Sequence, residues 1–289
     1  TAAPTAAPTA APTAAPTAAP TAAPTAAPTA APTATSAPGR APRRSKVKSP
    51  VLLATQLDAD EVDLLHNLAK QLGGRVTKGW SREVTHLIPA TKCGANCSTA
   101  LSAGRTSTAG RHCGRTIKFC SAVLAGQWIV GAGWLEASSR LGAWADETEH
   151  EIEGDHQSID EATGRGAGGP RIGRLRAAAA APRLFEGLRF FLPGGFTKPS
   201  KVEVGRLLQL GGGQCLERWP EEAEKEKGMA KGTTHEKKRR EESPPFLVLS
   251  AHSPAPRSLA ELCMARGLPP PIDLIWVMNS ISRHKLEAK

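Results

Sequence analysis

The chain has 289 residues, a formal net charge of +10 and six cysteines. This length predicts about two domains of roughly 100 to 200 residues each. No run of about 18 apolar residues occurs, and no charged leader precedes an apolar stretch, so we expect neither a membrane span nor a secretory signal and predict a soluble intracellular protein. The scattered cysteines match no compact disulfide framework, in agreement with a reducing compartment.

The first 48 residues predict a disordered linker. Residues 1–32 repeat TAAP, and the segment up to Pro50 is rich in alanine, proline, serine and basic residues. A proline every fourth residue removes hydrogen-bond donors of a helix, and so little apolar surface cannot offset the ordering entropy. Because the chain starts at Thr1 instead of methionine, we interpret it as a fragment or a processed product.

Two basic clusters lie in segments without apolar periodicity, one between Arg40 and Lys48 and the other at residues 237–240. Such runs suit nuclear import or weak contact with nucleic acid. The alternative is that they are solvated loops of a basic protein.

After Pro50 the pattern changes to short apolar strands separated by amphipathic helices, which is typical of an α/β domain. We expect Asp58 to cap the first helix, and Gly73 and Gly74 to end it. The expected strands are residues 51–54, 75–77, 84–88 and 128–130, and the expected helices are residues 58–72, 116–124 and 133–141. This order, β-α-β-β-α-β-α, fits one core of roughly 90 residues.

The second half repeats this order with weaker signals. The expected strands are residues 188–192, 214–217 and 246–250, and the expected helices are residues 198–210, 256–266 and 273–284. The charged run at 220–245 predicts a disordered insertion, because it has few apolar residues. The stretch rich in glycine, alanine and arginine at 155–182 is interpreted as the linker between the halves.

Several motifs of the two halves resemble BRCT repeats. The first half carries VTHLI (84–88), RTIKF (115–119) and GQWIVGAGWLEAS (126–138), whose tryptophans are Trp128 and Trp134. The second half carries PRLFEGLRFFLPGGF (182–196), LLQLGGGQ (207–214) and IWVMNSI (275–281). From Ser49 to Leu286 the chain is similar to a tandem BRCT module, as in the C-terminal region of the family of the BRCA-associated RING domain protein and the breast-cancer type 1 susceptibility protein.

This resemblance implies an α/β fold of two BRCT repeats, each a four-stranded parallel sheet flanked by helices, packed head to tail. The expected domains are a disordered tail (1–48), the first repeat (49–154), a linker (155–182) and the second repeat (183–289) with its insertion at about 220–245. It also implies that a groove between the repeats reads phosphoserine peptides, often with an aromatic residue three positions downstream.

A phosphoserine dianion is held well by a cation, a hydroxyl and a free backbone N–H. By resemblance, Thr55 matches the hydroxyl donor, Gln56 the residue that gives its backbone N–H, and Lys118 the phosphate-binding lysine. Family members commonly have glycine where Gln56 stands. The alternative for Lys118 is a solvated charge at the start of a helix, which we expect Thr116 to cap.

The resemblance also implies residues that contact the peptide beyond the phosphate. Arg115 matches an arginine that contacts the peptide main chain, and the alternative is an exposed charge. The positions that match the pocket for the downstream aromatic residue are Cys120, Lys198, Pro199, Leu274 and Met278, with Leu274 in place of an arginine. Cys120 and Met278 are also interpreted as core residues between the repeats.

Three other patterns carry less weight. Cys93, Cys97, His112 and Cys113 are ligand types that could hold zinc, but their spacing matches no common zinc pattern, so we predict no metal. The GRGAGG stretch (164–169) follows no expected strand and opens no expected helix, so it is interpreted as linker. No nucleophile, base and orienting acid come together, and we predict no cofactor and no catalysis in this segment.

We therefore predict a phosphopeptide-binding and chromatin adaptor of a nuclear protein of the DNA-damage response and recombination repair. Its expected partners are phosphorylated proteins and chromatin or nucleosomes, and no membrane. If the resemblance extends beyond Thr1, the segment is the targeting part of a RING ubiquitin-ligase subunit that has a RING heterodimer partner. Two alternatives stay open: a basic module that binds nucleic acid or poly(ADP-ribose), or a protein scaffold whose phosphate site has decayed, as Gln56 and Leu274 suggest.

Overall fold

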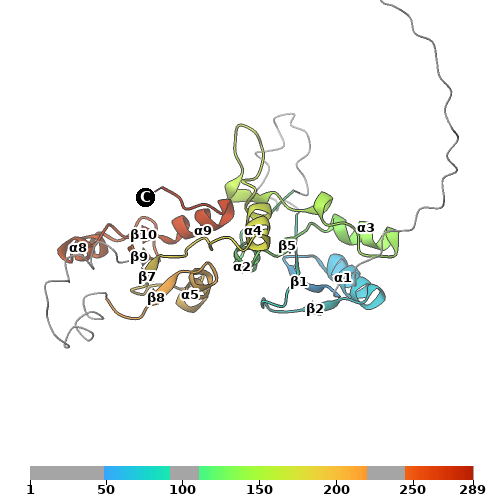
Figure 1. Cartoon of the computed structure of the whole chain (residues 1–289), viewed down its shortest axis with the longest axis horizontal. Coiled ribbons are helices and arrows are strands. Elements are labelled where there is room, and N and C mark those ends of the chain that lie inside the picture. Colours follow the sequence, from blue (N-terminus) through green and yellow to red (C-terminus); the bar gives the residue numbers. More distant parts are fainter. Residues whose placement is uncertain (1–48, 92–110, 220–244, 289) are drawn as a thin grey trace, which may run out of the picture. The chain divides into compact units, whose positions relative to one another are not determined.

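The computed structural model describes residues 49–91, 111–219 and 245–288 (Figure 1). The elements of the first repeat are β1 (Val51–Thr55), α1 (Ala59–Leu72), β2 (Arg75–Thr77), β3 (His86–Pro89), β4 (His112–Cys113), α2 (Ile117–Ala125), β5 (Trp128–Ile129) and α3 (Gly133–Leu141). Between the repeats lie β6 (Gly154–Asp155) and α4 (Gly169–Ala178). The elements of the second repeat are β7 (Arg189–Phe191), α5 (Lys201–Leu210), β8 (Gln214–Leu216), β9 (Phe246–Ser250), α8 (Arg257–Ala265), β10 (Ile272–Asp273) and α9 (Leu274–Arg283).

Each repeat has one four-stranded sheet in which every neighbouring pair of strands is parallel. The strand orders are β2-β1-β3-β5 and β10-β9-β7-β8, which are the same topology in the two repeats. Parallel strands need crossover connections, and the helices supply them. The structure therefore confirms the predicted α/β fold with two four-stranded parallel sheets.

Local signals explain where the helices begin and end. Asp58 and Glu61 form a capping box at the start of α1, and Gly73 ends that helix in the left-handed conformation at φ 79°. Ser200 and Glu203 form the same box at α5. Each box satisfies backbone N–H groups that have no partner within the helix. No helix in the described ranges combines the length and the apolar character needed to cross a bilayer.

Successive side chains along a strand point to opposite faces of the sheet and enter different hydrophobic cores. Leu52 packs with α1 and α3, whereas Leu53 packs with α2. This alternation follows from the two-residue period of a strand. The core that contains Leu53 continues into the second repeat through Phe185 and Val277. The two repeats therefore share one hydrophobic core.

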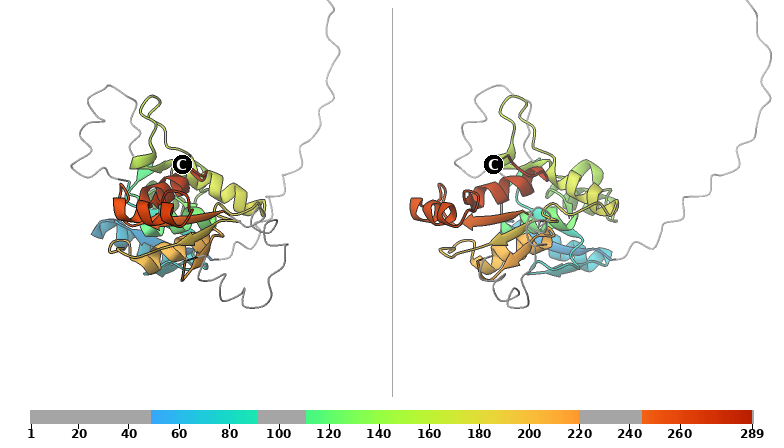
Figure 2. Two further views of the ribbon diagram at one scale, coloured as in Figure 1. Left: turned by 90° about the vertical axis from the view of Figure 1, so that its left-hand side faces the viewer. Right: turned by 60° about the vertical axis from the view of Figure 1, so that its left-hand side comes forward.

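The shared core is built around α2. This helix contacts α5 and α9 of the second repeat and α4 from between the repeats, and α4 also contacts α9 (Figures 1 and 2). A Cβ added at Gly126 would lie 2.3 Å from the Cβ of Ala177, so the end of α2 and the side of α4 approach closely only because Gly126 has no side chain. Helices of both repeats thus pack on α2.

The structure differs from the predicted elements in three places. The stretch GRGAGG does open a helix, because Gly169 is the first residue of α4, which Pro170 at its first turn favours. The fourth strand of the second repeat, β10, was not predicted: Asp273 was assigned to the final helix, and Ile272 was assigned to no element. A small parallel pair, β4 with β6, was not expected. The tail at 1–48 and the insertion at 220–244 lie outside the described residues.

Candidate functional site

Lys118 lies beside the end of the first strand. It is the second residue of α2, and its Nζ donates a 2.9 Å hydrogen bond to the carbonyl oxygen of Ala54. Ala54 precedes Thr55, which ends β1. The structure therefore brings the lysine ammonium next to the strand end that carries Thr55 and Gln56, two residues predicted to hold a phosphate.

Thr55 and Gln56 form the turn after β1. Thr55 is buried, and its carbonyl oxygen accepts from Ala90 N at 3.0 Å, which fixes the strand end against the residue after β3. Gln56 is exposed and has φ 61°. This is the left-handed region that glycine favours. Gln56 thus adopts a conformation that glycine favours, and the glutamine does not force a different turn.

The start of α2 faces the same strand end. The Thr116 side chain accepts from Phe119 N, so Thr116 caps the helix as expected. The positive end of a helix dipole and its unpaired N–H groups favour an anion. The ammonium of Lys118 adds a full positive charge there. This end of α2 has the electrostatic character that a phosphate site needs.

Arg115 is not an exposed charge. Its Nε donates to Asp155 Oδ1 at 2.9 Å, and its Nη1 donates to Asn279 Oδ1 at 2.9 Å. The two charged side chains are 11% and 0% exposed. Arg115 Nη2 and Asp155 Oδ2 are buried and have no hydrogen-bond partner among the described residues. Arg115 therefore joins the start of α2 to β6 and α9, and its contact with a peptide stays a prediction.

The residues predicted for the aromatic pocket lie in two places. Cys120 is fully buried in the shared core, Met278 packs against that core, and the Cys120 thiol donates to Met278 Sδ at 3.6 Å. Burial raises the pKa of the Cys120 thiol to about 12. Leu274 also packs against this core, whereas Lys198 is exposed. Cys120, Leu274 and Met278 thus gather at the junction of the repeats, and a peptide contact of Met278 or Lys198 stays a prediction.

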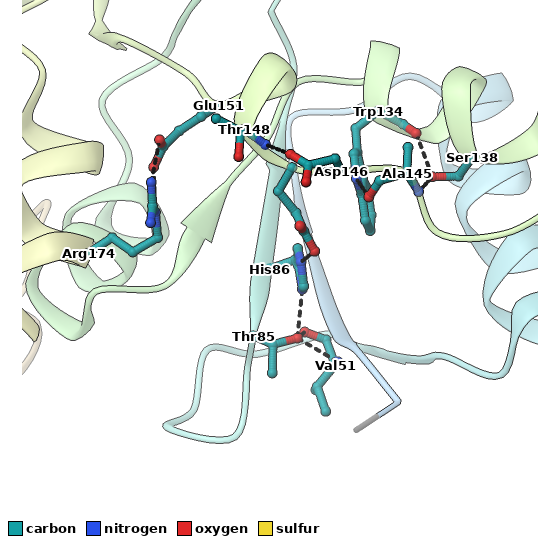
Figure 3. Close-up of polar contacts among 11 residues, drawn as sticks. Val51, Thr85, His86, Trp134, Ser138, Ala145, Asp146, Thr148, Glu151 and Arg174 are labelled. Atoms are coloured by element: carbon teal, nitrogen blue, oxygen red, sulfur yellow. Dashed lines mark hydrogen bonds and ion pairs between the residues drawn. The ribbon is translucent and has the colours of Figure 1, made fainter. Parts of the chain in front are cut away.

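The tryptophans of the first repeat have structural roles. Trp134 is stacked between His86 and Trp144, with ring centroids 4.9 Å away on each side. The Trp134 Nε1 donates a hydrogen bond to Ala145 O (Figure 3). The His86 ring also contacts Glu147 Oε1 at 3.1 Å and Thr85 Oγ1 at 2.8 Å. This buried stack fixes α3 on the sheet.

The structure describes only two of the four residues considered as zinc ligands. Cys93 and Cys97 lie outside the described residues. His112 and Cys113 form β4 and are both buried. Burial raises the pKa of the Cys113 thiol, which disfavours the thiolate that zinc requires. In the described ranges no three histidine, cysteine or acidic side chains group as metal ligands do.

The second repeat lacks the same side chains at its corresponding positions. By strand register Arg189 corresponds to Val51, since each pairs with the first residue of the neighbouring strand, so Pro193 stands at the position of Thr55. The second residue of α8 is Ser258 where α2 has Lys118. Pro256, in place of Thr116, makes no side-chain cap. The combination of hydroxyl, turn and ammonium therefore belongs to the first repeat.

Comparison with known proteins points to one family. A family model for the twin BRCT domain matches residues 51–107. BRCA1-associated RING domain protein 1 of Arabidopsis thaliana is 32% identical over 169 residues, which cover 58% of this chain and 20% of that protein. Its counterpart in Homo sapiens is 26% identical over 170 residues, which cover 59% of this chain and 18% of that protein. The chain thus matches about a fifth of the length of these relatives.

A solved structure shares the fold. The crystal structure of the S. pombe Brc1 BRCT5-BRCT6 domains matches with a TM-score of 0.50 and 15% sequence identity, over 83% of this chain and 95% of that chain. At this identity the likeness concerns the fold alone. It agrees with the two parallel sheets described above.

Proposed function

Since the described residues form a tandem BRCT module that resembles those of the BRCA1-associated RING domain and breast cancer susceptibility proteins, we propose that the chain binds phosphoserine peptides through Thr55, Gln56 and Lys118. A tandem BRCT module is a non-catalytic binding module. The observation that carries the proposal is the hydrogen bond from Lys118 Nζ to Ala54 O, which holds the ammonium at the end of β1.

Each group has a separate task at the phosphate. The Lys118 ammonium supplies the positive charge, the Thr55 hydroxyl donates a hydrogen bond, and the Gln56 N–H donates another. The Gln56 N–H has no backbone partner among the described residues, and its left-handed φ directs the turn as glycine would. When a phosphoryl group arrives, Lys118 exchanges a neutral carbonyl acceptor for a dianion, which is the stronger acceptor.

In the cell, the module is the targeting part of a nuclear protein of the DNA-damage response and recombination repair. The names of the relatives support a RING-containing protein, and the chain covers 20% of the Arabidopsis relative. A RING ubiquitin-ligase subunit with a RING heterodimer partner would use this segment to reach phosphorylated proteins or nucleosomes. The two basic clusters in the sequence support nuclear import.

Fluorescence titration of matched serine and phosphoserine peptides tests the proposal. Lys118→Met removes a charge-assisted hydrogen bond, so we expect roughly a tenfold or larger loss of affinity for the phosphopeptide and no change for the serine peptide. Lys201→Met is the matched control, because Lys201 is an exposed lysine in the first turn of α5. Equal affinity of the wild type for both peptides, or equal effects of the two variants, would contradict phosphate recognition.

The second candidate is a basic module that binds nucleic acid or poly(ADP-ribose), and the net charge of +10 favours it. Binding of this kind weakens steeply with salt because counterions are released. Titration of a single-stranded oligonucleotide and of poly(ADP-ribose) at increasing salt separates the two candidates. A steep salt dependence without preference for phosphoserine supports the basic module.

A further inference from the structure

A second concave surface lies at the other end of α2. It has a volume of about 1090 Å³. We call it the α2–α4 groove and define it by Arg82, Gly126, Arg176, Ala177, Arg183 and Leu184. Lys118 is in the first turn of α2 and Gly126 caps its last turn. A nine-residue helix is about 13 Å long, so the groove and the phosphate site are at opposite ends of the helix.

Arginines dominate the charge of this groove. Arg82, Arg174, Arg176 and Arg183 line it, and Glu186 is the only acidic residue among its described lining residues. Arg82, Arg176 and Arg183 are exposed. No described carboxylate forms an ion pair with Arg82 or Arg183. Two unpaired guanidinium groups are therefore available to an anionic ligand, and each can bind a carboxylate through two parallel hydrogen bonds.

Arg174 builds one wall of the groove. Its Nε and Nη2 each donate a 2.8 Å hydrogen bond to the Glu151 carboxylate (Figure 3), and its guanidinium lies 3.6 Å from the centroid of the Trp128 ring. Its charge is thus neutralised by Glu151. The fork and the stacked ring hold α4 against the end of β5, which keeps the groove walls in a fixed geometry.

Apolar side chains also line the groove, beside the arginines. Leu124, Ala125, Ala177, Ala180 and Leu184 all line it. A polynucleotide would place a hydrated sugar-phosphate backbone against these apolar side chains. Trp128 is the only Phe or Trp side chain in the described lining, and Arg174 covers its ring, so a base lacks the stacking surface that single strands use. An extended peptide with alternating acidic and apolar residues matches both the arginines and the apolar lining residues.

We propose that the α2–α4 groove binds an unphosphorylated acidic segment of a partner protein, with carboxylates on Arg82 and Arg183 and apolar side chains against the apolar lining residues. The groove is separate from the phosphate site, because the two lie at opposite ends of α2. This inference does not depend on the phosphoserine proposal.

Fluorescence polarisation with a short labelled peptide of alternating glutamate and leucine tests the proposal on the whole chain. The double variant Arg82→Gln/Arg183→Gln removes two exposed charges that make no ion pair in the described structure, so the fold is expected to persist with an unchanged melting temperature. We expect it to weaken peptide binding by roughly fivefold or more. The matched control Arg206→Gln/Arg257→Gln removes two exposed charges on α5 and α8, and we expect less than about a twofold effect.

The variant Lys118→Met distinguishes the groove proposal from the phosphoserine proposal. It is expected to leave binding of the glutamate–leucine peptide unchanged while it weakens binding of a phosphoserine peptide. Three results would overturn the groove proposal: no binding of the peptide at low salt, equal losses in the groove and control variants, or tighter and groove-dependent binding of a single-stranded oligonucleotide. A loss of binding on Arg82→Gln/Arg183→Gln alone supports it.

Discussion

The helices α2 and α8 hold the same position in two copies of one fold, but their surroundings differ. Five of the nine residues of α2 are buried, whereas Cys263 is the only buried residue among the nine of α8. Met264 of α8 is 66% exposed. Helices of both repeats pack on α2, and α8 covers one face of a single sheet. One topology therefore makes a central connecting helix in one copy and a peripheral helix in the other.

The side chains at the starts of α2 and α8 also differ. The start of α2 combines Thr116, Lys118 and the end of β1, while α8 starts at Pro256 and carries Ser258. Both ends of α2 face positively charged side chains, with Lys118 at one end and the α2–α4 groove at the other. The helix that joins the repeats is also the helix on which both proposed binding sites depend.

Core truncation gives the largest expected difference between the two helices. Phe119 and Leu259 are the third residues of α2 and α8, and Phe119 is fully buried whereas Leu259 is partly buried. We expect Phe119→Ala to lower the free energy of unfolding by about 4 kcal/mol and Leu259→Ala by about 2 kcal/mol or less. Urea unfolding followed by tryptophan fluorescence measures both. Equal losses would contradict the central role of α2.

Removal of the buried partner of Arg115 has the next largest expected effect. Asp155→Ala leaves the guanidinium without its carboxylate in a site that is almost closed to water, and we expect a loss of about 3 kcal/mol in the free energy of unfolding. Replacing both residues, as in Arg115→Met/Asp155→Ala, should cost less than Asp155→Ala alone, because no uncompensated charge remains. A double variant that is less stable than Asp155→Ala would contradict this account.

The junction of the repeats should also make stability depend on pH. Burial lowers the pKa of His284, which Arg176 lowers further, and burial lowers the pKa of His112 although Glu153 partly raises it. Below the ordinary value of 6.5 the unfolded chain binds more protons at these groups than the folded chain, so the free energy of unfolding falls as the pH decreases. Glu147 and Glu153, whose pKa values are lowered, add a loss only at more acidic pH.

Urea unfolding at about pH 7.5 and about pH 5.5 measures this dependence. The double variant His112→Gln/His284→Gln is expected to reduce it. An unchanged pH dependence in the double variant would assign the effect to other groups.

The smallest expected effect concerns the turn after β1. Gln56 has a left-handed φ, so Gln56→Gly relieves strain while it adds freedom to the unfolded chain, and we expect a net change below about 1 kcal/mol. Phosphopeptide affinity should be retained, because only the backbone N–H of this residue is used. Loss of binding in Gln56→Gly, with the fold intact, would show that the glutamine side chain takes part.

Local sequence signals predicted most helices and strands to within a few residues. The helix of residues 133–141 and the strand of residues 246–250 have the bounds of α3 and β9. The capping residues Asp58 and Thr116 were also found, because a cap depends on side chains within three residues. The helix α4 was missed although Pro170 in its first turn is a start signal, since its glycines and arginines resemble a linker.

Contacts between residues far apart in the chain could not be predicted from local sequence patterns. The alternative of an exposed Arg115 was wrong, because its partners Asp155 and Asn279 are 40 and 164 residues away in the chain. The two-residue strands β4 and β6 have no periodicity to detect, because an alternating pattern needs about four residues. The α2–α4 groove likewise joins residues from both repeats and from α4.

The central claim is that one end of α2 and the turn after β1 hold a phosphoryl group. Two-dimensional NMR of the amide-labelled chain, titrated with a phosphoserine peptide and with its serine counterpart, tests this most directly. We predict that the amides of Gln56 and Lys118 shift with the phosphopeptide alone, while the amides of Ser258 and its neighbours in α8 stay unchanged. Equal shifts with both peptides, or the largest shifts at α8, would contradict the account.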